Sequence, residues 1–164
     1  MGHESRLIEL QLELPPAARS LGVYRPIVVV DALAYLSGHG PIQSDGTAIT
    51  GRVGDDLTKE AGYQAARRTA MAMLATLRGH FGGLDAIRRL VKTTGFVNAT
   101  PEFKEHPAVI NGFSELLRDV FGAEAGVGAR SAVGVASIPA GWAVEIEAIF
   151  ELEEIMPQAA MTDA

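Results

Sequence analysis

The chain has 164 residues, of which 48% are hydrophobic and 21% charged, and its net charge at pH 7 is −6. This composition is typical of one globular domain with a buried core, and it excludes a chain that is disordered throughout. The absence of cysteine excludes disulfides, thiolate metal sites and a cysteine nucleophile, and it fits a reducing compartment. An acidic surface also disfavours binding to the phosphate backbone of nucleic acids.

The sequence contains no signal for a membrane or for export. Its apolar runs are shorter than the ~18 residues that suggest a membrane-spanning helix. The start, Met-Gly-His-Glu-Ser-Arg, lacks the basic segment and following apolar segment of a secretion signal. We therefore expect a cytoplasmic protein with no membrane partner.

The first third of the chain predicts one helix and three strands. Residues 4–13 have the pattern of a short amphipathic helix, which the two prolines after it would end. Apolar runs predict strands at 27–30 and 32–36, and a further short strand is expected near 48–53.

A long helix is predicted over residues 57–79, where apolar side chains recur at spacings of three and four. Asp55 and Asp56 offer a cap for its first turn. Most of its apolar face is alanine, and such small side chains allow a helix to lie close to a sheet. We therefore expect this helix to have a packing role.

A strand and a second long helix follow. Residues 87–98 predict the strand, and Pro107 suits the first turn of the helix. Gly122 can adopt the left-handed conformation that commonly ends a helix, so we expect the helix to end there.

Two strands near 131–138 and 143–152 complete the predicted sheet. Two long helices can cover only one of its faces, so residues 1–153 are predicted to form a single α/β (α+β) domain with a mixed sheet. Within it, residues 1–14 form an N-terminal helical extension, and residues 154–164 are expected to be a flexible tail. The second sheet face carries many small and apolar side chains, which indicates that another subunit covers it.

Two charged side chains near the end of the chain are candidates for chemistry. Arg130 opens a strand directly after a glycine-rich loop, where its planar fork can bind a carboxylate through two parallel hydrogen bonds. Glu145, on what we expect to be the neighbouring strand, shares a side with Glu147. Two such carboxylates can carry out acid–base chemistry or position a water. An exposed arginine and a solvated strand face give the same patterns, so spacing alone leaves both readings open.

Four further polar residues lie where they could contribute to a site. Tyr24 is in a loop, and Ser37 and His39 lie in the Ser-Gly-His-Gly segment that ends a strand. Asn111 lies early in the second long helix. Each also has a purely structural interpretation. Tyr24 could be a packing aromatic, Ser37 and His39 could belong to an ordinary glycine turn, and Asn111 could have a capping or structural role in the helix. The four histidines are far apart in sequence, so no metal site is predicted.

Taken together, these residues resemble the RidA (YjgF-type) family over about residues 5–153. Tyr24 and Ser37 stand thirteen residues apart, as do the tyrosine and serine of that family. The most specific segments resemble its Ala-Arg-Ser and Glu-Ile-Glu-Ala signature and its Val-Lys-Thr strand; they are Ala129-Arg130-Ser131, Val144-Glu145-Ile146-Glu147-Ala148 and Val91-Lys92-Thr93.

The resemblance implies a chorismate-mutase-like fold and a homotrimer whose sheets form a central β-barrel, with clefts between subunits. It also implies hydrolytic deamination of reactive 2-enamino and 2-imino acids to 2-keto acids and ammonia, with no metal or organic cofactor. In this reading Arg130 holds the substrate carboxylate and Glu145 helps to position the attacking water. Tyr24 and Ser37 line the pocket, and Asn111 supports it.

The sequence departs from the typical pattern at two expected pocket positions, and it resembles a longer branch, the endoribonuclease L-PSP-like group. Ala132 stands where the family has a cysteine, and His39 stands where it has a glutamine. Both changes would alter the shape and polarity of the pocket. One alternative is a trimer that binds a small carboxylate without turnover. Another is an endoribonuclease, which the acidic charge and the lack of a basic groove with stacking aromatics disfavour.

Overall fold

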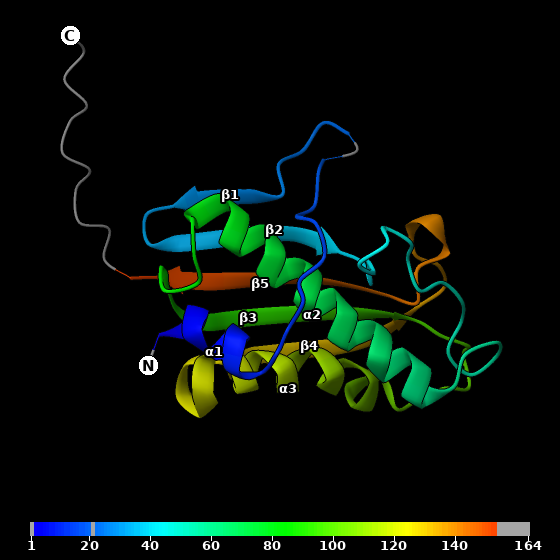
Figure 1. Ribbon diagram of the computed structural model, residues 1–164. Coiled ribbons are helices and arrows are strands. Elements are labelled where there is room, and N and C mark those ends of the chain that lie inside the picture. The colour runs from blue at the N-terminus through cyan, green and yellow to red at the C-terminus, as the bar shows by residue number, and fades with distance from the viewer. Residues whose placement is uncertain (1, 21, 154–164) are drawn as a thin grey trace, which may run out of the picture.

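The computed structural model describes residues 2–20 and 22–153 and contains one five-stranded sheet with helices on one face (Figure 1). The expected flexible tail, residues 154–164, lies outside the described residues. The elements in chain order are α1 (His3–Glu9), β1 (Ile27–Val30), β2 (Leu33–His39), α2 (Lys59–Phe81), β3 (Ile87–Asn98), α3 (His106–Ala125), β4 (Ala129–Val135), η1 (Pro139–Gly141) and β5 (Val144–Leu152).

The strand order in the sheet is β1-β2-β5-β3-β4, so β1 and β4 are its edges. Only β3 and β4 are parallel; the other neighbouring pairs are antiparallel, which confirms the mixed sheet. The order also corrects one expectation. The strand that carries Glu145 is not the neighbour of the strand that carries Arg130, because β3 lies between β5 and β4.

The strand expected near 48–53 is wrong. This stretch makes only isolated bridges, to Ile42, Trp142, Leu57 and Ala99. Its backbone hydrogen bonds go to several separate segments, and Gly51 turns the chain with φ +129. A continuous ladder therefore cannot form.

Both long helices were located within a few residues, but their ends differ from the expectations. Thr58, and not Asp55 or Asp56, caps α2, because its side chain accepts a hydrogen bond from the Ala61 N–H. In α3, Gly122 has φ +89 and leaves the helical conformation, but a final turn follows and the helix ends at Ala125, with Gly126 as its C-cap.

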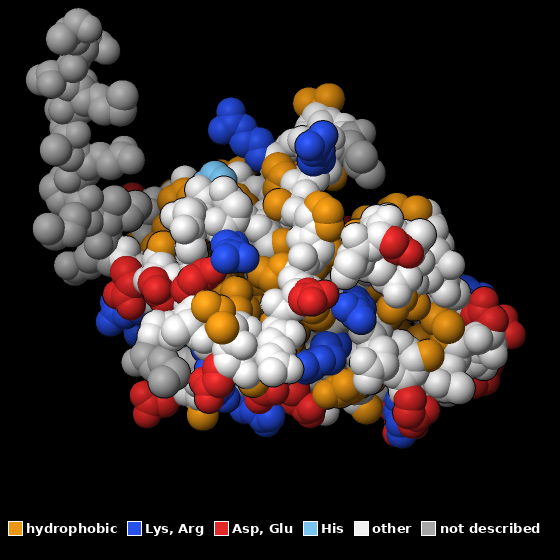
Figure 2. Space-filling model, in the orientation of Figure 1, with side chains coloured by type: hydrophobic (Ala, Val, Ile, Leu, Met, Phe, Trp, Pro, Cys, Tyr) orange, Lys and Arg blue, Asp and Glu red, His pale blue; other side chains and the backbone are white. Residues whose placement is uncertain are grey.

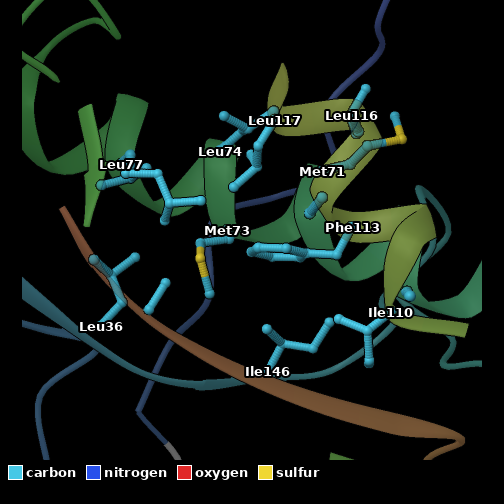
Figure 3. Packing of buried hydrophobic residues seen from close by; sticks show 14 of the residues in the cluster. Leu36, Met71, Met73, Leu74, Leu77, Ile110, Phe113, Leu116, Leu117 and Ile146 are labelled. Atoms are coloured by element: carbon cyan, nitrogen blue, oxygen red, sulfur yellow. The ribbon is translucent and has the colours of Figure 1, made fainter. Parts of the chain in front are cut away.

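The core lies between the two long helices and the sheet. Met73, Leu74 and Leu77 of α2 meet side chains of α3 such as Phe113, and Ile146 rises from β5 (Figure 3). The alanine face of α2 is buried, as predicted. In β5, alternate residues from Val144 to Leu152 are buried against the helices, so Glu145 and Glu147 point to the face that the helices leave uncovered. We call this the open face.

On the helix side of the molecule, acidic and basic side chains are interspersed and do not gather into one basic patch (Figure 2). Of the helices in the described ranges, none is long and apolar enough to cross a membrane.

Candidate functional site

Arg130 is the second residue of the edge strand β4, and its side chain is half-buried. One terminal nitrogen, Nη1, donates to Asn111 Oδ1 at 2.8 Å and to Ser114 Oγ at 3.1 Å. None of the ion pairs formed among the described residues involves Arg130. The guanidinium is thus held by neutral oxygens, which fix its position and leave its charge uncompensated.

The two oxygens come from one face of α3, because residues three apart lie side by side on a helix. Asn111 was expected to support the pocket, and the structure places it directly against Arg130. Ser114 was missed. The signal that could have found it is its three-residue spacing from Asn111. We refer to Arg130, Asn111 and Ser114 as the arginine group.

Glu145 is half-buried on the open face of β5. Burial raises the pKa of its carboxyl above the ordinary value, and the neighbouring Glu147 carboxylate raises it further. The carboxylate lies against Gly38, where a Cβ atom would overlap it. Glycine at position 38 therefore gives Glu145 the space that it occupies.

Ser37 and the Tyr24 loop lie next to this carboxylate in the fold. Ser37 is on the open face of β2, one residue before Gly38, and its hydroxyl donates to the Arg25 carbonyl at 2.7 Å. Its N–H donates to the Pro26 carbonyl at 3.0 Å, so this residue holds the loop that carries Tyr24. Tyr24 itself is half-exposed in that loop.

A cavity of about 310 Å³ lies on the open face between β2, β5 and β3. Polar groups at Ser37, Lys92, Thr94 and Glu147 line it together with apolar side chains, including Tyr35. Lys92 also donates to Ser131 Oγ at 3.1 Å, which ties β3 to β4 on this face.

The remaining two expected pocket residues lie on the helix side of the sheet. Ala132 follows Arg130 on the same face of β4 and packs against the core. His39 is 4% exposed; its Nε2 lies 2.9 Å from Thr76 Oγ1 of α2, and burial lowers its pKa. The imidazole is therefore enclosed by protein atoms on the face opposite to Glu145.

The geometry thus divides the expected site residues into two groups. The arginine group lies at the β4 edge on the helix-covered side, whereas Glu145 lies on the open face together with Ser37. One chain alone does not bring Arg130 and Glu145 together. No three His, Asp or Glu side chains group as metal ligands in the part of the chain that the structure describes.

Comparison with known proteins agrees with this architecture. The family described as "YjgF/chorismate_mutase-like, putative endoribonuclease" matches residues 4–144, so the match begins within α1. Protein TCP17 of Trypanosoma cruzi is 40% identical over 148 residues, which cover 90% of this chain and 92% of that protein.

Solved structures are also similar. The protein Atu1372 of Agrobacterium tumefaciens, described as of unknown function, is 42% identical with a TM-score of 0.83 and 92% coverage of both chains. A "putative endoribonuclease" of Shewanella oneidensis is 31% identical with a TM-score of 0.88, covering 93% of this chain and all of that one. The Rid-family protein YyfA of Yersinia pestis is 26% identical with a TM-score of 0.58, covering 85% of this chain and 95% of that one. This chain belongs to the YjgF/RidA-like family.

Proposed function

We propose that this protein hydrolyses reactive 2-imino acids, and their 2-enamino tautomers, to 2-keto acids and ammonia in a cleft between two copies of the chain. The observation that carries the proposal is the arginine group. A half-buried guanidinium that two neutral oxygens hold in place, with no acidic partner among the described residues, suits an organic carboxylate.

The chemistry asks little of the protein beyond positioning. A protonated imine carbon is already electrophilic, so a water held over C2 of the substrate can add to it. Glu145 accepts a proton from this water as the C–O bond forms, giving a neutral carbinolamine. The same carboxyl then returns the proton to nitrogen. As the C–N bond breaks, the carboxylate takes the proton of the new hydroxyl group, so that the neutral 2-keto group forms, and this proton leaves with ammonia as ammonium. Burial raises the pKa of Glu145, which makes its carboxylate a stronger base towards the attacking water.

A second chain is part of this proposal because Arg130 and Glu145 of one chain point to opposite faces of the sheet. A homotrimer with its sheets in a central barrel would let the arginine group of one subunit meet the Glu145 side of the next. Exposed apolar side chains on the open face, among them Val28, Tyr35 and Val133, support a covering subunit.

One observation also favours a second candidate, a trimer that binds a small carboxylate without turnover. The arginine group is complete within one chain and needs no contribution from Glu145 to hold a carboxylate. The expected ligand is the same class of 2-oxo or 2-imino acid, so binding alone does not separate the two functions.

Turnover separates them. An amino-acid oxidase generates the imino acid in the assay mixture. The rate of keto-acid release is then measured in competition with capture of the imine by semicarbazide. We expect the protein to accelerate keto-acid release and Glu145→Gln to lower that acceleration strongly while 2-oxobutanoate still binds. Binding of 2-oxobutanoate with no acceleration by the wild type would favour the second candidate.

A further inference from the structure

The buried imidazole of His39 connects Ser37 with Thr76. These two residues contact the two ends of the loop that carries Tyr24. Its Nδ1 lies 2.7 Å from the Ser37 carbonyl oxygen, and its Nε2 lies 2.9 Å from Thr76 Oγ1. Both His39 and Thr76 are almost fully buried, 4% and 5% exposed. Hydrogen bonds in such a dry environment are costly to leave unmade, so these contacts constrain the backbone around them.

Thr76 is the point at which the start of the loop reaches α2. The N–H of Ala18 donates to Thr76 Oγ1 at 3.3 Å, and the same hydroxyl lies 3.1 Å from the Ala72 carbonyl oxygen. Figure 1 shows the segment before residue 21 crossing α2 on the helix side of the molecule. Residues 16–20 are exposed, so this hydrogen bond is an anchor on a segment that buries little surface.

The hydrogen-bond directions around His39 follow from its neutral ring. A carbonyl oxygen only accepts, so Nδ1 of His39 donates to Ser37. Burial lowers the pKa of His39 and favours the neutral ring, in which Nε2 is an acceptor. The Thr76 hydroxyl has one proton, which lies within reach of both Nε2 and the Ala72 carbonyl oxygen; when Nε2 accepts it, the hydroxyl oxygen still accepts from the Ala18 N–H. The loop backbone, α2 and the end of β2 are thereby joined through one side chain.

The other end of the loop is anchored to the residue that His39 contacts. Ser37 donates through its hydroxyl to Arg25 and through its N–H to Pro26. We infer that His39 is a positioning residue, because by joining Ser37 to Thr76 it holds both ends of the segment from Ala18 to Arg25 and so fixes the place of Tyr24. Its importance for activity rests on the proposed function, in which Tyr24 lines the cleft.

Thr76 allows the sharpest test because a nearly isosteric change removes its hydroxyl. Thr76→Val breaks the links to Ala18 and His39, and Thr76→Ser keeps them. Thr69→Val is the matched control, since Thr69 is also buried in the same helix and, among the described residues, its hydroxyl bonds only to the Ala65 carbonyl four residues earlier. His39→Phe tests the imidazole directly.

Two readouts are measured on the full chain. The first is trypsin cleavage after Arg19, followed by mass spectrometry; the Arg25–Pro26 bond resists trypsin and does not interfere. The second is kcat and KM for imino-acid hydrolysis. We expect about five- to tenfold faster cleavage and a loss of about the same size in kcat/KM for Thr76→Val, the scale of one or two net hydrogen bonds. Thr76→Ser should restore both values.

A double variant shows whether the effect acts through Tyr24. If it does, the loss in kcat/KM from Tyr24→Ala and that from Thr76→Val should not add. Equal cleavage rates for Thr76→Val and Thr69→Val would overturn the inference, as would faster cleavage with unchanged or fully additive kinetics. If the wild type has no turnover, the proposed deaminase activity fails on its own. Affinity for 2-oxobutanoate then decides: weaker binding by Thr76→Val sustains the positioning role, and unchanged binding refutes it.

Discussion

Replacing Arg130 by alanine removes the one group that we expect to hold the substrate carboxylate. A hydrogen bond to a charged group contributes about 1.5–3 kcal/mol, and a bidentate carboxylate contact has two of them. The expected loss in binding free energy is therefore about 3–6 kcal/mol, which corresponds to about a 10²- to 10⁴-fold fall in kcat/KM. Arg130→Lys keeps the charge without the planar fork, so its loss should be intermediate.

The fold should survive this change. Arg130 is half-buried on an edge strand, and its partners Asn111 and Ser114 are also only half-buried, so water can reach them in the variant. Arg88→Ala is a matched control, because Arg88 lies on β3 and pairs with Glu151, away from the arginine group. We expect the thermal unfolding midpoint and the oligomeric state of Arg130→Ala to resemble those of Arg88→Ala.

The assay is steady-state hydrolysis of imino acids generated by an amino-acid oxidase, together with calorimetric titration of 2-oxobutanoate. Wild-type kcat/KM in Arg130→Ala, with the oligomer intact, would show that the carboxylate binds elsewhere. A loss of activity shared by Arg88→Ala would show that the effect is not specific to the arginine group.

Three further predictions concern the open face. Glu145→Gln should lower kcat more than it raises KM. Because the pKa of Glu145 is raised in the fold, its stabilising contribution is present below the ordinary pKa and is lost as pH rises through the raised value. Calorimetry should therefore show Glu145→Gln unfolding at a higher temperature than wild type at pH 7, with the gap closing below about pH 4, and a constant gap would contradict this. Gly38→Ala introduces a Cβ that overlaps the Glu145 carboxylate, so kcat should fall by up to about a hundredfold without loss of folding; unchanged kinetics would mean that this carboxylate does not act. Val133→Asp should yield monomers by light scattering if the open face is covered by another subunit, whereas Val127→Asp, an exposed valine in the loop before β4, should not. Identical masses for both variants would count against the interface.

Local sequence patterns were enough for most of the secondary structure. The alternation from Val144 to Leu152 predicted a strand with one buried face, and the alanine-rich spacing predicted α2 as a packing helix, because both patterns reflect the period of the element itself. The strand predicted at 48–53 is wrong because the conformation of this stretch depends on distant contacts and not on its own period. Its apolar composition suits a strand, but its hydrogen-bond partners lie in several distant segments that no local pattern specifies.

The residue types of the candidate site were also available from the sequence, including the guanidinium of Arg130 and the carboxylate of Glu145. Their arrangement was decided by tertiary structure. Strand order depends on pairing between residues far apart in the chain, and it places β3 between β4 and β5. The crossing of α3 over β4 selected Ser114 as a second partner of Arg130, and the packing of α2 on the sheet enclosed His39 against Thr76. Such contacts depend on how segments far apart in the chain pack against each other. No single sequence motif specifies that packing.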